Sequence, residues 1–163
     1  MRKLKRLVCS EDAAELVEFG IASMVFFTLL FGIVEFCLVI YAGNFVESAA
    51  QHGARYAMVR GSDWTSACAS ADSYSCQATA ANVQSYVLSL PHPALNLTAD
   101  SITPTWLATT ASGASTACTT NPYAQGCQVQ VKVSYTFGLM IPFLPAKYSS
   151  IPLSSTSVET IQD

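Results

Sequence analysis

The hydrophobic residues of this chain are concentrated in one long block near the N-terminus. Residues 19–45 form a run of 27 residues in which Glu35 is the only charged side chain. An α-helix of this length measures about 40 Å, whereas the hydrocarbon core of a bilayer is about 30 Å thick. The block therefore predicts a membrane-spanning helix. It also exceeds the roughly 7–15 apolar residues of a secretory signal peptide, which favours an uncleaved anchor.

The helical pattern continues past this block. Glu47, Gln51 and Arg55 lie four residues apart on one helical face, with opposite charges at its two ends. A Gly-Ser pair that begins at Gly61 is a typical stop signal. We therefore expect a single helix over residues 11–59.

Small residues line another face of the second half of this helix. They recur at the i, i+3, i+4, i+7 spacing and are Ala50, Gly53, Ala54 and Ala57. Such a groove lets a second backbone approach closely. It packs either on the chain's own domain or on another subunit, and the two alternatives are compatible.

Shorter patterns follow beyond the helix. Apolar residues at helical spacing predict a short helix over residues 77–90, and residues 128–137 alternate strictly enough to predict a strand. We also expect a strand at 100–109, edge or bulged because of Pro104, and a closing strand at 151–162. The predicted fold class is α+β, with a long N-terminal transmembrane helix that extends into a small extracytoplasmic domain with an antiparallel sheet.

Charge indicates how this helix is oriented. The net charge is −3 and only 12% of the 163 residues are charged, so nothing indicates nucleic-acid binding. Half of the basic residues lie at the N-terminus, at Arg2, Lys3, Lys5 and Arg6. The positive-inside rule places this end in the cytoplasm. We therefore expect a cytoplasmic basic leader (1–13), a transmembrane and stem helix (14–61) and an extracytoplasmic domain (62–163).

Four cysteines lie in the outer domain. Their even number and outside location predict two disulfides, with three pairings open. We favour the local pairs Cys68–Cys76 and Cys118–Cys127, because each pair brackets a turn-rich segment. The short C-x-x-C spacing of a zinc site is absent from the sequence, so we expect no metal.

The sequence carries no motif that indicates catalysis. It has no G-x-S-x-G, P-loop or H-E-x-x-H pattern, and its histidines, His52 and His92, lie in separate segments. We predict a protein that is not an enzyme and needs no cofactor. The apolar segment 138–145 is either a docking surface or a tip buried on the domain, and we favour burial.

The two acids of the apolar helix need a physical reason, because an ionised carboxylate in lipid is costly. Glu18 lies at the cytoplasmic edge, and Glu35 follows 17 residues later. This spacing places them about 25 Å apart along the helix and roughly 100° apart around it. We expect them to make separate contacts with neighbouring subunits or membrane partners.

Three motifs in this region together resemble the TadE-like family of pseudopilins, from bacterial tight-adherence pilus systems. They are Val17-Glu18-Phe19-Gly20, then Gly32-Ile33-Val34-Glu35-Phe36, and Ala49-Ala50-Gln51-His52-Gly53-Ala54-Arg55-Tyr56-Ala57. The resemblance covers roughly residues 13–61. It implies a pseudopilin-like, single-pass protein of the bacterial inner membrane, with its C-terminal domain periplasmic or extracellular.

The resemblance also implies partners and processing. A prepilin peptidase would cut between Ala13 and Ala14, which puts Glu18 at the fifth mature position, ahead of Phe19; the family pattern has Gly where this chain has Ala13. By analogy with pilins, Glu18 would neutralise the N-terminal amine of a neighbouring pilin-like subunit. Candidate assembly contacts are Glu18, Glu35, Ala50, Gly53, Ala54, Arg55 and Ala57.

The function expected from the sequence is the assembly or anchoring of a tight-adherence pilus, through helix packing and through contacts with other subunits and the assembly machinery. The alternative is a membrane-tethered extracytoplasmic binding module unrelated to pili. A third class, an anchored thiol oxidoreductase, would require a reactive cysteine pair.

Overall fold

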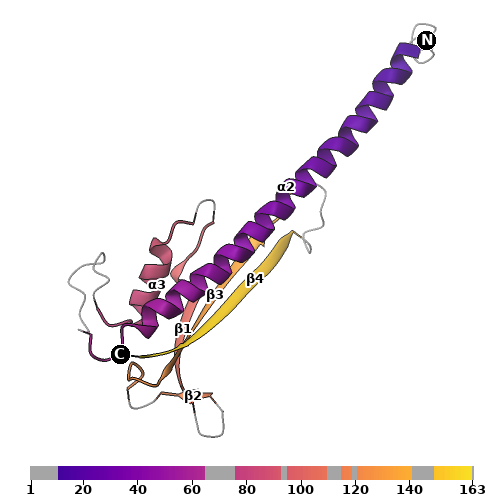
Figure 1. Cartoon of the computed structure of the whole chain (residues 1–163). Coiled ribbons are helices and arrows are strands. Elements are labelled where there is room, and N and C mark those ends of the chain that lie inside the picture. Colours follow the sequence, from indigo (N-terminus) through magenta and orange to yellow (C-terminus); the bar gives the residue numbers. More distant parts are fainter. Residues whose placement is uncertain are drawn as a thin grey trace.

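One long helix, α2 (Glu11–Met58), dominates the computed structural model of the chain (Figure 1). The structure describes residues 11–64, 76–92, 95–109, 115–118, 121–140 and 149–162. The 48 residues of α2 correspond to about 72 Å at 1.5 Å per residue. The first proline of the sequence is Pro91, so no proline interrupts the hydrogen-bond ladder of α2. The predicted single helix over residues 11–59 is confirmed.

The outer part of the chain contains a four-stranded antiparallel sheet with the strand order β2-β1-β3-β4. Its strands are β1 (Ile102–Thr109), β2 (Ser115–Ala117), β3 (Gln128–Gly138) and β4 (Ser150–Thr160). A 3-10 turn, η1 (Ala99–Ser101), leads into β1. The helix and the sheet together confirm the α+β fold class.

The short strand β2 was not predicted. Its three residues lie in a segment rich in Ser, Thr, Gly and Ala, which is typical of turns. They are extended because they pair with Leu107–Thr109 at the end of β1. A strand this short depends on its partner, and its own sequence carries no alternation that would reveal it.

The helix predicted over residues 77–90 is α3 (Ala80–Ser89). The side chain of Thr79 accepts a hydrogen bond of 3.3 Å from the backbone N–H of Asn82 and so caps the first turn. At the other end, Leu90 adopts an extended conformation ahead of Pro91, as the residue before a proline favours. Val83 and Val87 point into the core from one face of α3.

Pro104 lies in β1 where that strand has a neighbour on one side only. It pairs with Val131 of β3, whereas β2 begins to pair with β1 only at Leu107. A proline has no N–H to donate, so it fits a strand only on an unpaired side. The prediction of an edge position is confirmed for this part of β1.

The core lies between the sheet and the two helices. Figure 1 shows the second half of α2 crossing one face of the sheet with α3 beside it, and both helices contact strands on that face. Val129, Val131 and Val133 of β3 are fully buried there, whereas the intervening Gln130 and Lys132 face the other side. The predicted alternation in β3 is therefore confirmed, with one covered and one solvated face.

Gly53 marks the closest approach between α2 and the rest of the core. A Cβ atom at this position would lie 2.9 Å from Cγ2 of Val87 in α3 and 3.1 Å from Cγ1 of Val131 in β3. Both distances are shorter than normal carbon–carbon contacts. A side chain here would push both elements away from α2.

We expect the change Gly53→Ala to destabilise the domain relative to the matched change Gly43→Ala. Gly43 lies in the same helix and has nothing within 4 Å of its ideal Cβ. Both changes gain the same helix propensity, about 1 kcal/mol, so the difference between them isolates the crowding at Gly53. We expect the free energy of unfolding, measured by thermal unfolding of the full chain in detergent, to be about 1–3 kcal/mol lower for Gly53→Ala than for Gly43→Ala. Equal stability of the two variants would contradict the close packing.

Candidate membrane and assembly surface

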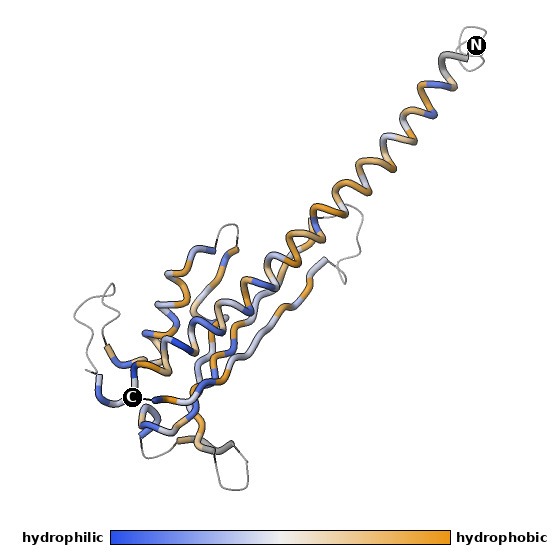
Figure 2. The backbone as a smooth tube through the Cα atoms, in the orientation of Figure 1, coloured by the Kyte–Doolittle hydropathy of each residue, from blue (hydrophilic) through white to orange (hydrophobic). Residues whose placement is uncertain are grey.

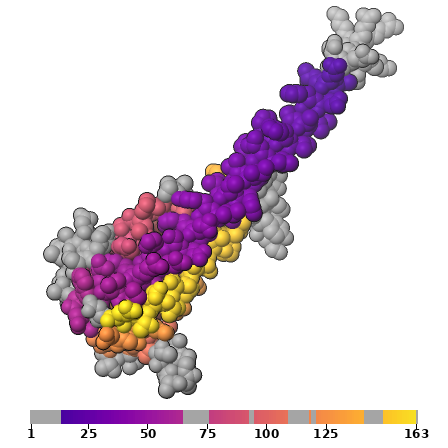
Figure 3. All heavy atoms as spheres, in the orientation of Figure 1, coloured from indigo at the N-terminus to yellow at the C-terminus, as the bar shows by residue number. Residues whose placement is uncertain are grey.

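The first half of α2 projects from the rest of the structure as a bare apolar rod. Figures 2 and 3 show this segment extending away from the domain, and the colours of Figure 2 show that most of its residues are hydrophobic. Its most apolar 18-residue window has a mean hydropathy of 2.4 and is only 6% buried. Phe19, for example, is 74% exposed. Such a surface is not stable in water, and the helix is long and apolar enough to cross a membrane.

The burial of α2 changes at Ala42, the first fully buried residue of the helix. Residues 14–41 are exposed or partly exposed throughout. These 28 residues would extend about 42 Å, compared with about 30 Å for the lipid hydrocarbon core. The rod is therefore long enough to span the hydrocarbon core and reach the headgroup layers on both sides.

The sequence-predicted processing and pairing residues lie on this rod. Ala14, Glu18 and Phe19 are exposed, and α2 continues without a break through the Ala13–Ala14 bond. Within the described ranges, Glu18 makes no hydrogen bond or ion pair to another part of the chain. Its carboxylate is therefore open to a group from another molecule.

Glu35 makes a contact that the sequence did not reveal. Its Oε1 accepts a hydrogen bond of 3.0 Å from the backbone N–H of Met140, which follows β3. Its Oε2 is enclosed and has no hydrogen-bond partner among the residues that the structure describes. The observed partner belongs to the same chain, whereas the sequence suggested a neighbouring subunit or a membrane protein.

The lengths of the elements explain why Glu35 and Met140 meet. At the end of the domain farthest from the rod, the backbone N–H of Gln162 donates a hydrogen bond to the carbonyl oxygen of Met58, the last residue of α2. Gln162 follows Thr160, which pairs with Gln128, the first residue of β3. From Gln128 to Gly138, β3 rises about 33 Å, and α2 covers about 35 Å between Met58 and Glu35. Because α2 and β3 lie side by side and start at the same end of the domain, Glu35 of α2 and the end of β3 lie at the same height. The comparison of these lengths was the sequence signal that could have predicted the contact.

The small-residue groove on the second half of α2 is covered by the chain's own domain. All four of its residues are buried in the core formed with β3 and α3, namely Ala50, Gly53, Ala54 and Ala57. Of the two alternatives left open by the sequence, packing on the own domain is the observed one. While the domain is packed on α2, this surface is not accessible to another subunit.

The opposite face of this helix half is exposed. Arg55 and Gln51 are exposed, and the side-chain amide of Gln51 approaches Glu47 Oε1 at 3.5 Å. The face that carries these residues points away from the sheet. Arg55 is the one candidate contact in this half of α2 that remains accessible among those the sequence suggested.

An aromatic cluster that sequence reasoning missed ties the end of α2 to α3. The rings of Tyr56 and Tyr86 stack with their centroids 4.4 Å apart. The guanidinium of Arg60 lies 4.3 Å from the centroid of Tyr56 and 5.2 Å from that of Trp64. In the sequence, Tyr56 and Trp64 lie four residues on either side of Arg60, and this spacing is the signal that was available.

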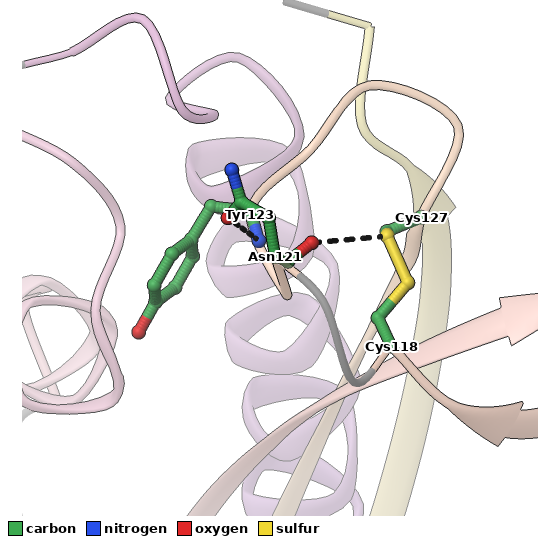
Figure 4. The surroundings of a disulfide bond; sticks show 4 residues. All are labelled: Cys118, Asn121, Tyr123 and Cys127. Carbon is green, nitrogen blue, oxygen red and sulfur yellow. Dashed lines mark hydrogen bonds between the residues drawn. A yellow bond between two sulfur atoms is a disulfide. The ribbon is translucent and has the colours of Figure 1, made fainter.

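The disulfide Cys118–Cys127 is present, with the pairing that the turn-rich spacing predicts. It closes the turn between β2 and β3, inside which the side chain of Asn121 accepts a hydrogen bond of 3.1 Å from the N–H of Tyr123 (Figure 4). The carbonyl oxygen of Asn121 also lies 3.5 Å from Sγ of Cys127. An oxidised sulfur has no proton to donate, so this is a close contact. Cys76 is also disulfide-bonded, and its predicted partner, Cys68, lies outside the described residues.

The described parts of the chain contain no group of three His, Cys, Asp or Glu side chains that could hold a metal ion. His52 is exposed on α2, and Nδ1 of His92 lies 2.6 Å from the carbonyl oxygen of Leu90. Met140, in the segment 138–145, is 87% exposed. For this residue the expected burial is wrong, and residues 141–148 lie outside the described ranges.

The apolar rod and the start of the buried half of α2 coincide with a known family pattern. Residues 14–55 match the model of the TadE-like protein family. This match confirms the resemblance carried by the three sequence motifs and places its limit at Arg55. No curated protein and no solved structure matches the chain. The TadE-like segment therefore covers the exposed rod and most of the packed stem.

We expect removal of the Cys118–Cys127 bond to lower the free energy of unfolding. In the chain-entropy model, a closed loop with a sequence separation of 9 contributes roughly 2–3 kcal/mol. The double change Cys118→Ser and Cys127→Ser should show this loss in chemical denaturation of the full chain in detergent. Cys37→Ser, at an exposed free cysteine, serves as the control and should leave the domain's stability unchanged. A double variant as stable as the parent would contradict the prediction.

Proposed function

We propose that this chain is a single-pass protein of the bacterial inner membrane that takes part in assembling or anchoring a tight-adherence pilus. The observation that carries the proposal is the match of residues 14–55 to the TadE-like family, together with the exposure of the same helix outside the domain. The role is non-catalytic and depends on contacts between helices and between subunits.

The orientation follows from charge. Arg2, Lys3, Lys5 and Arg6 precede the apolar rod, and the positive-inside rule favours the cytoplasm for such a segment. The sheet domain then lies on the periplasmic or extracellular side. Disulfide bonds persist in those compartments, which supports this orientation.

Two separate surfaces are available for assembly. The first is the apolar rod, where Glu18 has no partner within the described chain and could pair with the amine of a neighbouring subunit. The second is the exposed face of the stem around Arg55, Gln51 and Glu47. The small-residue groove is excluded from this role as long as the domain stays packed on α2.

We expect Glu18→Ala to reduce piliation strongly while leaving the protein in the membrane. An exposed acid at the lipid boundary contributes little to insertion, whereas a poorly solvated charge pair between subunits is strong. Pilus counts by electron microscopy and membrane fractionation measure the two effects separately. Glu15→Ala, a change at another acid of the same helix, is the matched control and should leave piliation normal. Normal piliation in Glu18→Ala would count against the proposed contact.

A segment swap distinguishes this function from a tethered binding module. Residues 14–41 are replaced by an unrelated membrane span of equal length, because the buried core of the domain begins only at Ala42. We expect the swapped protein to insert and to fold but to lose piliation. A swapped protein that retains full function would favour the tethered module, in which the helix is only an anchor.

Processing by a prepilin peptidase is tested by the intact mass of the protein from its native membrane. We expect a mass that lacks residues 1–13, so that Ala14 carries the new amine four residues before Glu18. A full-length mass would remove the amine-to-Glu18 contact from the proposal and would leave a permanent cytoplasmic leader.

A further inference from the structure

The contact between Glu35 and Met140 joins the tip of a hairpin to the apolar rod. β3 and β4 pair along their whole lengths, from Gln128–Thr160 to Gly138–Ser150. At the tip, the N–H of Leu139 donates a hydrogen bond of 2.8 Å to the carbonyl oxygen of Ser149. One residue further, the N–H of Met140 donates to Glu35 at 3.0 Å. The hairpin therefore reaches the rod in a defined position.

The position of Glu35 places this tip at the level of the lipid. Glu35 lies seven residues before Ala42, where burial of α2 in the domain begins, which corresponds to about 10 Å of helix. It also lies 17 residues after Glu18, about 25 Å, within the roughly 30 Å of a hydrocarbon core. Met140, where the described part of the hairpin ends, therefore lies at the height at which the rod leaves the bilayer.

The side chains around this contact are those of a lipid-facing surface. Phe31, Phe36 and Leu38 of the rod are exposed, and so is Met140, at 87%. Exposed methionine and aromatic side chains are unfavourable in water and favourable in the interface between acyl chains and headgroups. No charged residue other than Glu35 occurs between residues 19 and 45, so the rod on either side of this contact presents an apolar surface to lipid.

The hydrogen bond offsets part of the cost of a carboxylate at this height. A backbone N–H donor compensates part of the desolvation of Glu35, and the backbone N–H of Met140 is satisfied in return. The enclosed Oε2 of Glu35 shows that water is largely excluded from the contact. An exclusion of water strengthens the remaining hydrogen bond.

We propose that Glu35 is a positioning residue that holds the β3–β4 hairpin against the membrane-spanning helix, so that Met140 lies in the lipid interface of the leaflet nearest the domain. The partner that Met140 contacts is the phospholipid bilayer. The inference rests on the proposed function only in that α2 spans the membrane. It makes the position of Met140 at the bilayer surface depend on a single carboxylate.

The test uses the full chain in phosphatidylcholine vesicles that contain lipids with a nitroxide near the headgroup end of the acyl chain. An environment-sensitive fluorophore is attached to single cysteines introduced in a Cys9→Ser, Cys37→Ser background, with the cysteines of the domain oxidised. The probe positions are Met140→Cys at the tip, Phe31→Cys on the rod, and Val158→Cys on β4. Val158 is exposed and apolar, but eight residues from Ser150, which is about 27 Å from the tip.

We expect quenching at positions 140 and 31 and none at 158. In Glu35→Ala, which has no acceptor, the docked hairpin should be disfavoured roughly tenfold, and quenching at 140 should fall toward the value at 158. Glu35→Gln retains a side-chain oxygen that accepts from the Met140 N–H, so it should keep quenching at 140 near the parent value.

The outcomes separate the inference from the proposed function. Quenching at position 31 without quenching at 140 would overturn the lipid contact and leave the membrane span intact. No quenching at position 31 would show that α2 is not in the bilayer and would remove the proposed function as well. Unchanged quenching at 140 in Glu35→Ala would overturn the role of Glu35, even if the tip meets lipid.

Discussion

The close approach of α2 to the sheet is the constraint on which the rest of the structure depends. At Gly53 there is no room for even a Cβ atom between α2, Val87 and Val131. The small residues on this face allow the helix backbone to lie directly on the β3 valines, and α3 closes the third side. A larger residue would separate the helix from the sheet, and the domain would lose the element that also connects it to the membrane.

One helix therefore serves two environments, and its sequence changes where the environment changes. Up to Tyr41 the rod carries large apolar residues on every side, which suits lipid but no single protein partner. From Ala42 most of the apolar residues on the buried face are small, and polar residues occupy the opposite face. Because no break separates the two halves, any movement of the rod is transmitted rigidly to the domain. This rigidity suits a subunit that assembles through helix packing.

The junction between the two halves is where structure adds most to the TadE-like match. The matched residues 14–55 include Glu35, but its partner, Met140, comes from the part of the chain outside the match. The sheet domain thus completes a contact that begins on the helix. In the proposed pilus subunit, such a contact would keep the domain at one angle to the bilayer and present the exposed face around Arg55 consistently to neighbouring subunits.

The sequence by itself determined the elements whose pattern is local: the uninterrupted helix α2, the alternation of β3 and the edge character of β1 at Pro104. It also carried the resemblance to the TadE-like family over residues 14–55, because the three motifs lie within one helix. Only the tertiary structure decided which partner fills the small-residue groove, that β2 forms a strand, and that Glu35 meets Met140. These three features depend on how distant segments meet. The pattern of a helical face shows that the face is covered, but it does not show which segment covers it. The partner of Glu35 lies 105 residues away, and the contact depends on the matching lengths of α2 and β3.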